Sequence, residues 1–284
     1  IAAPLHAEDG LTALEVQRMV FNDDIDGALL AAQTAFAKAP SAPMGRLLQD
    51  LLAKTGKEKE RGSIILESHP EPLRQGLAAR IRAPKQAASA LAALLKKEGA
   101  PPCFRLDLAL ARLAAGKPSA ARAEAESYTE ALPQVAEGHL VLGRVLRAQK
   151  KLKNARQAFE EALALEPGHP EATSALLELD EDMDAALAEQ MLATALRLYP
   201  NNASVRFAHS EHQIRLGELE EATKTLLAAL ELRSDLALVH TRLSEVWRLR
   251  REYKKSGEAA AQALKVDSIT MALRVRALRS SGFA

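Results

Sequence analysis

The chain has 284 residues, of which 48% are hydrophobic and only 4% aromatic, and its formal net charge is +1. This balanced charge gives no general reason to expect a nucleic acid or an acidic membrane as a partner. The single cysteine, Cys103, excludes an internal disulfide and a multi-cysteine metal cluster. No stretch approaches about 18 consecutive apolar residues, so we expect no transmembrane segment.

Residues 1–8 begin with the mostly small and apolar run IAAPLHA, and they fit either the end of a secretory signal or the frayed start of a first helix. The first interpretation favours a periplasmic or secreted protein of a bacterial envelope, whereas the second leaves a cytoplasmic location open. Residues 9–101 predict degenerate helical repeats, which are interrupted by turn signals and by three prolines, Pro70, Pro72 and Pro84.

Two amphipathic helices are predicted between Ala136 and His169. Apolar or small residues recur there at spacings of three and four, namely His139, Leu142, Gly143, Leu146, Ala155, Phe159, Ala162 and Leu163. This spacing places side chains on one face of a helix, and a polar turn at 149–151 separates the two helices. One such pair cannot bury its apolar faces alone, so the architecture depends on whether the pattern recurs.

The pattern recurs with a period of about 34 residues. The alanine at 155 reappears as Ala121, Ala188 and Ala222, and the proline at 167 reappears as Pro133 and Pro200. The chain therefore resembles the tetratricopeptide repeat family, through Leu142, Gly143, Ala155, Phe159, Ala162 and Pro167. The resemblance implies an all-α solenoid of stacked antiparallel helix pairs in a right-handed superhelix, with about seven to eight repeats plus a C-terminal helix.

Regular repeats are expected over 102–270, in the windows 102–135, 136–169, 169–202, 203–236 and 237–270. Residues 271–284 predict one further helix that caps the last repeat. A cap needs a polar outer face, which Arg274, Arg276 and Arg279 would supply. The alternative is that the chain was cut inside another repeat.

No enzyme signature is present in the sequence, and we expect no catalytic residues, no cofactor and no metal. His209 and His212 are three residues apart on a predicted helix, but no further ligand accompanies them at a recognisable spacing. By phase, the inward side of that helix carries Arg206, His209, Ser210 and Gln213. Polar residues at such positions must find hydrogen bonds or face a ligand.

The family resemblance also implies that the first helix of each pair lines a concave groove. By phase, the groove positions are Leu106, Leu110, Leu140, Arg144, Arg147, Leu177, Asp180, Glu181, Phe207, Glu211, Ile214, Thr241, Glu245 and Arg248. The apolar members would form an exposed strip that docks a peptide or helix of a partner. The alternative is that neighbouring repeats cover them.

Charge is segregated along the chain. Residues 170–236 hold 13 acidic and 5 basic residues, whereas residues 237–284 hold 4 acidic and 10 basic residues. Such runs are commonly solvated surfaces. The alternative is a bipolar surface that orients a partner, or head-to-tail self-association through the acidic segment 178–184 and the basic segment 248–255.

The sequence as a whole predicts a non-enzymatic scaffold or adaptor for protein binding and complex assembly, set in a bacterial envelope if residues 1–8 are a signal remnant. One alternative is a repeat arm of a larger enzyme such as a glycosyltransferase. Another is a regulator that senses a peptide through the polar cluster around His209. We expect no nucleic acid, because the basic C-terminal helices offer only Trp247 and Tyr253 for stacking on bases.

Overall fold

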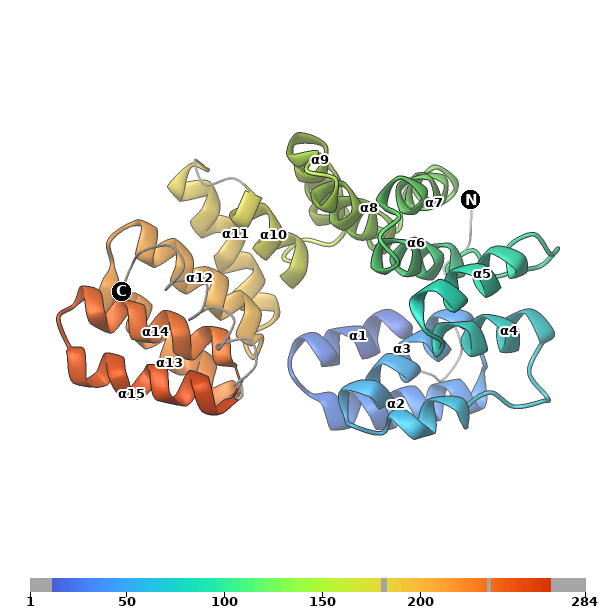
Figure 1. Ribbon diagram of the computed structural model, residues 1–284, viewed down its shortest axis with the longest axis horizontal. Helices are drawn as coiled ribbons and strands as arrows, with labels where there is room; N and C mark the ends of the chain where they lie inside the picture. Colours follow the sequence, from blue (N-terminus) through green and yellow to red (C-terminus); the bar gives the residue numbers. More distant parts are fainter. Residues whose placement is uncertain (1–11, 180–182, 234–235, 267–284) are drawn as a thin grey trace. The chain divides into compact units, whose positions relative to one another are not determined.

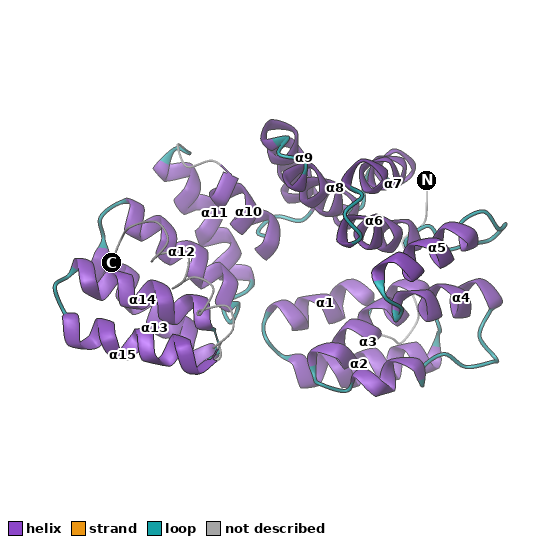
Figure 2. Ribbon diagram, viewed as in Figure 1, coloured by secondary structure: helices purple, strands orange, loops and turns teal. Residues whose placement is uncertain are grey.

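The computed structural model describes residues 12–179, 183–233 and 236–266 (Figure 1). Within these residues the chain forms fifteen α-helices and one short 3₁₀ helix, and no strand (Figure 2). The predicted all-α class of stacked helix pairs is therefore confirmed. The predicted segments 1–8 and 271–284 lie outside the described residues. No helix of the described part is long and apolar enough to span a bilayer.

The chain divides into two compact units, unit 1 (Ile1–Ala172) and unit 2 (Thr173–Ala284). Unit 1 contains α1 (Ala13–Phe21), α2 (Ile25–Lys38), α3 (Ala42–Lys54), η1 (Glu58–Gly62), α4 (Glu71–Arg80), α5 (Pro84–Leu94), α6 (Phe104–Ala114), α7 (Pro118–Ala131), α8 (Ala136–Ala148), α9 (Leu152–Leu165) and the start of α10 (Pro170–Leu179). Unit 2 contains the rest of α10, then α11 (Ala185–Leu198), α12 (Ala203–Arg215), α13 (Leu219–Leu232), α14 (Ala237–Leu249) and α15 (Tyr253–Val266).

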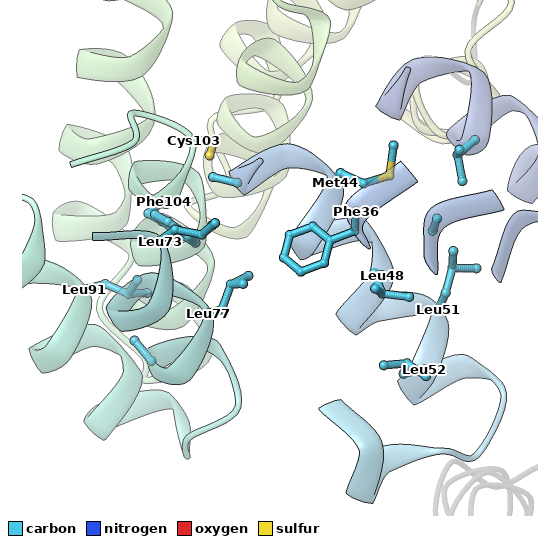
Figure 3. Packing of buried hydrophobic residues seen from close by; sticks show 14 of the residues in the cluster. Phe36, Met44, Leu48, Leu51, Leu52, Leu73, Leu77, Leu91, Cys103 and Phe104 are labelled. Atoms are coloured by element: carbon cyan, nitrogen blue, oxygen red, sulfur yellow. The ribbon is translucent and has the colours of Figure 1, made fainter. Parts of the chain in front are cut away.

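The N-terminal part of unit 1 departs from regular pairing after α3. The predicted break follows at Gly56, whose backbone has φ 74°, and the short η1 stands where a second helix would lie. The core of this part joins side chains from α2 through α6, including Phe36, Leu48, Leu77 and Phe104 (Figure 3). Helices of this region therefore share one core although their repeats are irregular.

The central pair α8 and α9 shows why glycine and phenylalanine recur together. Phe159 of α9 is fully buried, and a Cβ atom at Gly143 of α8 would lie 2.7 Å from its ring. Only a residue without a side chain allows the two helices to approach so closely. Gly143 and Leu146 are buried as the helical phase predicts, whereas His139 and Leu142 are only partly buried.

Unit 2 has two apolar clusters of small and aliphatic side chains. One joins Leu177 to α11 and α12, and the other joins α13, α14 and α15 around Leu226 and Val246. Asp184 and Asn202 cap α11 and α12 by accepting hydrogen bonds from the first-turn backbone amides. The positions of these helices thus follow both from the spacing of apolar residues and from the polar N-cap residues.

Five of the turns between paired helices share one backbone feature, a residue in the left-handed region. This residue is glycine at Gly116 and Gly217. A side-chain-bearing residue takes the same conformation at Asp23 (φ 60°), Lys150 (φ 59°) and Arg251 (φ 62°). Left-handed backbone costs such a residue about 1 kcal/mol relative to glycine.

Candidate functional site

A pocket of about 1010 Å³ opens on unit 2 between α10, α12 and α14, the first helices of three successive pairs. Its apolar lining includes Leu177, Phe207, Leu238 and Val239, and its charged lining consists of Glu178, Glu211, Arg215 and Arg242. An apolar hollow with a few fixed charges is the usual character of a binding site.

Helix α12 supplies the central wall of this pocket. Its lining residues Ser204, Phe207, Ala208, Glu211 and Arg215 follow a spacing of three and four along the helix. Residues at this spacing lie on one helical face. The same periodicity that defines the helix therefore places an aromatic ring and two charges side by side in the pocket.

The two arginines at the pocket make hydrogen bonds to neighbouring groups. Arg242 of α14 donates from Nε to Oε1 of Glu211 at 2.6 Å, makes a second bond to the same carboxylate, and donates from Nη1 to Oε2 of Glu245 at 2.6 Å. The hydrogen bonds to Glu211 raise the pKa of Arg242 above its ordinary value. Arg215 donates to the carbonyl of Leu177 at 3.5 Å. A partner would thus meet a preorganised rim of charge.

Several predicted groove residues of unit 2 lie at this pocket. Leu177, Phe207 and Glu211 line it, and Glu245 reaches its rim through Arg242. Ile214 instead packs against the cluster of α13, α14 and α15, and neither Thr241 nor Arg248 is among the lining residues. The predicted groove residues Asp180 and Glu181 lie outside the described residues.

The expected exposed apolar strip is wrong for three of its members. Leu106, Leu140 and Leu177 are 0%, 6% and 5% exposed. Leu106 packs in one cluster with Val141 and Val145 of α8, so neighbouring first helices cover it. Leu110 is partly buried against the same cluster. Leu177 can therefore form only the floor of the pocket, and the first-helix side chains of unit 1 serve packing.

The basic groove positions of unit 1 are Arg144 and Arg147. Arg144 donates from Nε and Nη2 to the two carboxylate oxygens of Glu171, at the start of α10. Burial opposes its charge, but the bonds to Glu171 raise the pKa of Arg144. Arg147 is exposed. Arg144 therefore links two successive first helices, as Arg242 does in unit 2.

A buried ionic cluster in unit 1 was not predicted from the sequence. Arg46 of α3 and Asp107 of α6 are each 7% exposed and form an ion pair at 2.7 Å. Arg80 of α4 reaches the other oxygen of Asp107 at 2.9 Å, and Glu137 of α8 pairs with Arg46 at 2.8 Å. Burial opposes the charge of Arg46, but Asp107 and Glu137 hold its pKa well above the ordinary range. The cluster ties four helices together.

The predicted polar face of α12 lies against α11 and outside the pocket lining. Ser210 and Gln213 are buried, whereas Arg206 and His209 are only partly buried, and His212 is 3% exposed. The Nε2 atoms of His209 and His212 lie 3.7 and 4.0 Å from Oε2 of Glu189. Burial lowers the pKa of His209. In the described part of the chain no group of His, Cys, Asp or Glu side chains is arranged to hold a metal ion.

Comparison with known proteins identifies the repeats. Residues 106–170 match the tetratricopeptide repeat family model, and no curated protein sequence matches the chain. A thermophilic tetratricopeptide repeat protein of Thermus thermophilus, TTC0263, is similar at 22% identity and a TM-score of 0.53, over 62% of this chain and 96% of that one.

A second solved structure, the Cut9–Hcn1 hetero-tetramer of the APC/C, is similar at 14% identity and a TM-score of 0.69. The match covers 90% of this chain and 53% of that chain, so this chain spans about half the length of the larger one. Both structural similarities concern the fold. Together with the matched segment they confirm the resemblance drawn from the sequence: residues 106–170 are tetratricopeptide repeats, and the chain is built on the helical repeat fold of that family.

Proposed function

We propose that the chain is a non-enzymatic interaction scaffold that holds a peptide or helix of a partner protein in the pocket of unit 2. Repeat solenoids of this kind present concave surfaces formed by successive repeats, which they use for binding. The observation that carries the proposal is the pocket of about 1010 Å³ between the first helices α10, α12 and α14.

The pocket offers apolar surface to a side chain of a partner. Phe207 is only partly buried, and Leu238 at the mouth is 47% exposed. Burying one aliphatic or aromatic side chain of a partner against such surface contributes about 1.5–3 kcal/mol. The mixed charges of Glu178, Arg215 and Arg242 favour one orientation of the partner over its reverse.

Other predictions about function stay open as predictions. The prediction of a role in an envelope assembly depends on residues 1–8, which lie outside the described residues. The prediction of a repeat arm of a larger enzyme depends on sequence beyond this chain. A peptide-sensing role for His209 has less support than the pocket itself, because His209 faces Glu189 of α11 and is absent from the pocket lining.

A peptide library displayed on phage and selected on the immobilised full chain tests the proposal. Selected peptides are then labelled, and their affinities are measured by fluorescence anisotropy. We expect Leu238→Glu, which places a charge at the pocket mouth, and Ser204→Trp, which fills the pocket, to weaken binding at least about tenfold. Both positions are exposed, so circular dichroism should show that the variants remain folded.

The matched control is Leu227→Glu on α13. Leu227 is 41% exposed, and its replacement makes the same chemical change outside the pocket lining. This variant should leave peptide affinity within about twofold of the native chain. Peptides that bind the native chain and the two pocket variants equally well would show that the pocket is not the binding site.

A further inference from the structure

The turn between α14 and α15 forms an exposed patch that combines apolar and basic side chains. Leu249 is 51% exposed and Tyr253 is 66% exposed. Arg248, Arg251 and Lys254 beside them in the sequence are also exposed. Contiguous apolar surface rimmed by charges marks a site of interaction, and Leu249 and Tyr253 flank the same turn. We call these five residues the basic turn.

The corresponding turn one repeat earlier has the opposite charge. Between α12 and α13, Glu218, Glu220 and Glu221 are exposed, and Leu216 beside them is 49% exposed. We call these four residues the acidic turn. The two turns have the same place in their helix pairs, because Gly217 and Arg251 both hold the left-handed position. One fold feature thus carries acidic charge in one repeat and basic charge in the next.

The two turns are neighbours on unit 2. Arg250, between Leu249 and Arg251, donates from Nη1 to Oγ1 of Thr223, in the first turns of α13, at 2.9 Å. Arg250 also pairs with Glu252 at 3.1 Å. A single side chain therefore connects the basic turn to the helix that begins at the acidic turn. We call the two turns together the edge of unit 2: the acidic turn is its negative half, the basic turn is its positive half, and each half has one exposed leucine.

Such an edge is complementary to a copy of itself. A two-fold rotation brings the negative half of one copy against the positive half of the other, and does so twice in the same interface. We propose that the chain forms a symmetric dimer through this edge, with the acidic turn of each copy against the basic turn of the other. Leu216, Leu249 and Tyr253 would supply the apolar centre.

This arrangement differs from the pairing suggested by the sequence. There the acidic partner was the segment 178–184, most of whose charges lie outside the described residues. The acidic turn is itself described and borders the basic turn. Adjacent halves fit within one two-fold interface, whereas head-to-tail pairing of separate patches gives a ring or an open filament.

Sedimentation velocity of the full chain at 50 and 500 mM NaCl tests the proposal. We expect a species of twice the chain mass of 30.6 kDa at low salt, with no larger series. Its dissociation constant should rise at least about tenfold at high salt, because charges at an exposed edge are screened. A chain that stays monomeric up to about 100 μM at low salt would overturn the proposal, since a specific dimer should form at micromolar concentrations.

Two charge-reversed variants give the sharper measurement. Arg248→Glu with Lys254→Glu makes both halves negative, and Glu218→Lys with Glu220→Lys makes both halves positive. Each variant alone should lose at least about tenfold in dimer affinity, whereas an equimolar mixture should restore it. The control is Arg197→Glu, which reverses an exposed charge on α11 and should leave the dimer unchanged.

The outcomes separate the possible interfaces. Recovery in the mixture supports the two-fold pairing of unlike halves. Variants that dimerise as well as the native chain would show that the edge is not the interface. A ladder of trimers and larger species for the native chain would overturn the symmetric arrangement. Peptide binding in the pocket is measured separately and does not enter these results.

Discussion

One ion pair between first helices of unit 1, Arg46 with Asp107, lies in the interior, whereas the ion pair between α12 and α14 of unit 2 borders an open pocket. Arg46 and Asp107 are each 7% exposed and join α3 to α6. The corresponding pair of unit 2, Glu211 and Arg242, joins α12 to α14 with side chains that are 29% and 36% exposed. The link between α3 and α6 is therefore buried, whereas the link between α12 and α14 is solvated. The pair of Arg144 with Glu171 in unit 1 is also solvated, with side chains that are 40% and 34% exposed.

The two kinds of link differ in their energetics. A buried ion pair has high desolvation costs and strongly penalises the loss of one partner, so it restricts a region to one arrangement. An ion pair at a pocket rim contributes little to stability but remains accessible to a ligand. The buried cluster thus fixes its part of unit 1, whereas the rim pair suits the binding that we propose for the pocket of unit 2.

The largest expected effect is that of removing Asp107. We expect Asp107→Ala to destabilise the chain by about 3–5 kcal/mol, because Arg46 and Arg80 would lose their shared carboxylate. The matched change Glu211→Ala in unit 2 should cost at most about 1 kcal/mol. Urea unfolding followed by circular dichroism measures both. Equal losses for the two variants would contradict the division between buried and solvated links.

A second, smaller effect concerns a buried histidine of unit 1. His169 is 2% exposed and lies edge-on to Phe21, with ring centroids 4.8 Å apart. Burial lowers the pKa of His169 to about 4 from its ordinary value of 6.5. Below pH 6.5 the unfolded chain therefore binds a proton that the folded chain does not. Stability is complete above this pH and should fall by about 2 kcal/mol between pH 6.5 and 5.

The variant His169→Gln should remove most of this pH dependence in urea unfolding at pH 7, 6 and 5. Phe21→Leu is the control, since it removes the ring contact but keeps the titrating group and should retain the slope. The partly buried His209 of unit 2, whose pKa is also lowered by burial, adds a change of the same sign. An unchanged slope in His169→Gln would show that other groups govern acid sensitivity.

The repeat pattern of the sequence predicted the helix pairs because it records local packing. Gly143 and Phe159 recur together since a side chain at the glycine would collide with the ring. The same periodicity placed Phe207 and Glu211 on one face of α12, where both line the pocket. Features that depend on one helix face or on one helix pair could therefore be predicted.

Features that depend on contacts between repeats could not. Helical phase assigned Leu106 and Leu140 to an exposed face, but a first helix in a stack has neighbours on both sides and buries both faces. The pairing of Arg46 with Asp107 spans 61 residues, and Arg46 lies in the part of the chain where the repeat pattern is degenerate. Local periodicity contains no information about which of these charges meet.

The smallest expected effect compares one turn from each unit. Lys150 of unit 1 and Arg251 of unit 2 both hold the left-handed position that glycine holds at Gly217. Replacement by glycine relieves this backbone but adds entropy to the unfolded chain, so Lys150→Gly and Arg251→Gly should each stabilise by at most about 1 kcal/mol. Arg251→Gly also removes a cation from the proposed dimer edge. We therefore expect both variants to raise the urea midpoint slightly, and only Arg251→Gly to weaken the dimer in sedimentation. If both variants dimerise like the native chain, Arg251 contributes nothing to the edge and its strained backbone has no role in association.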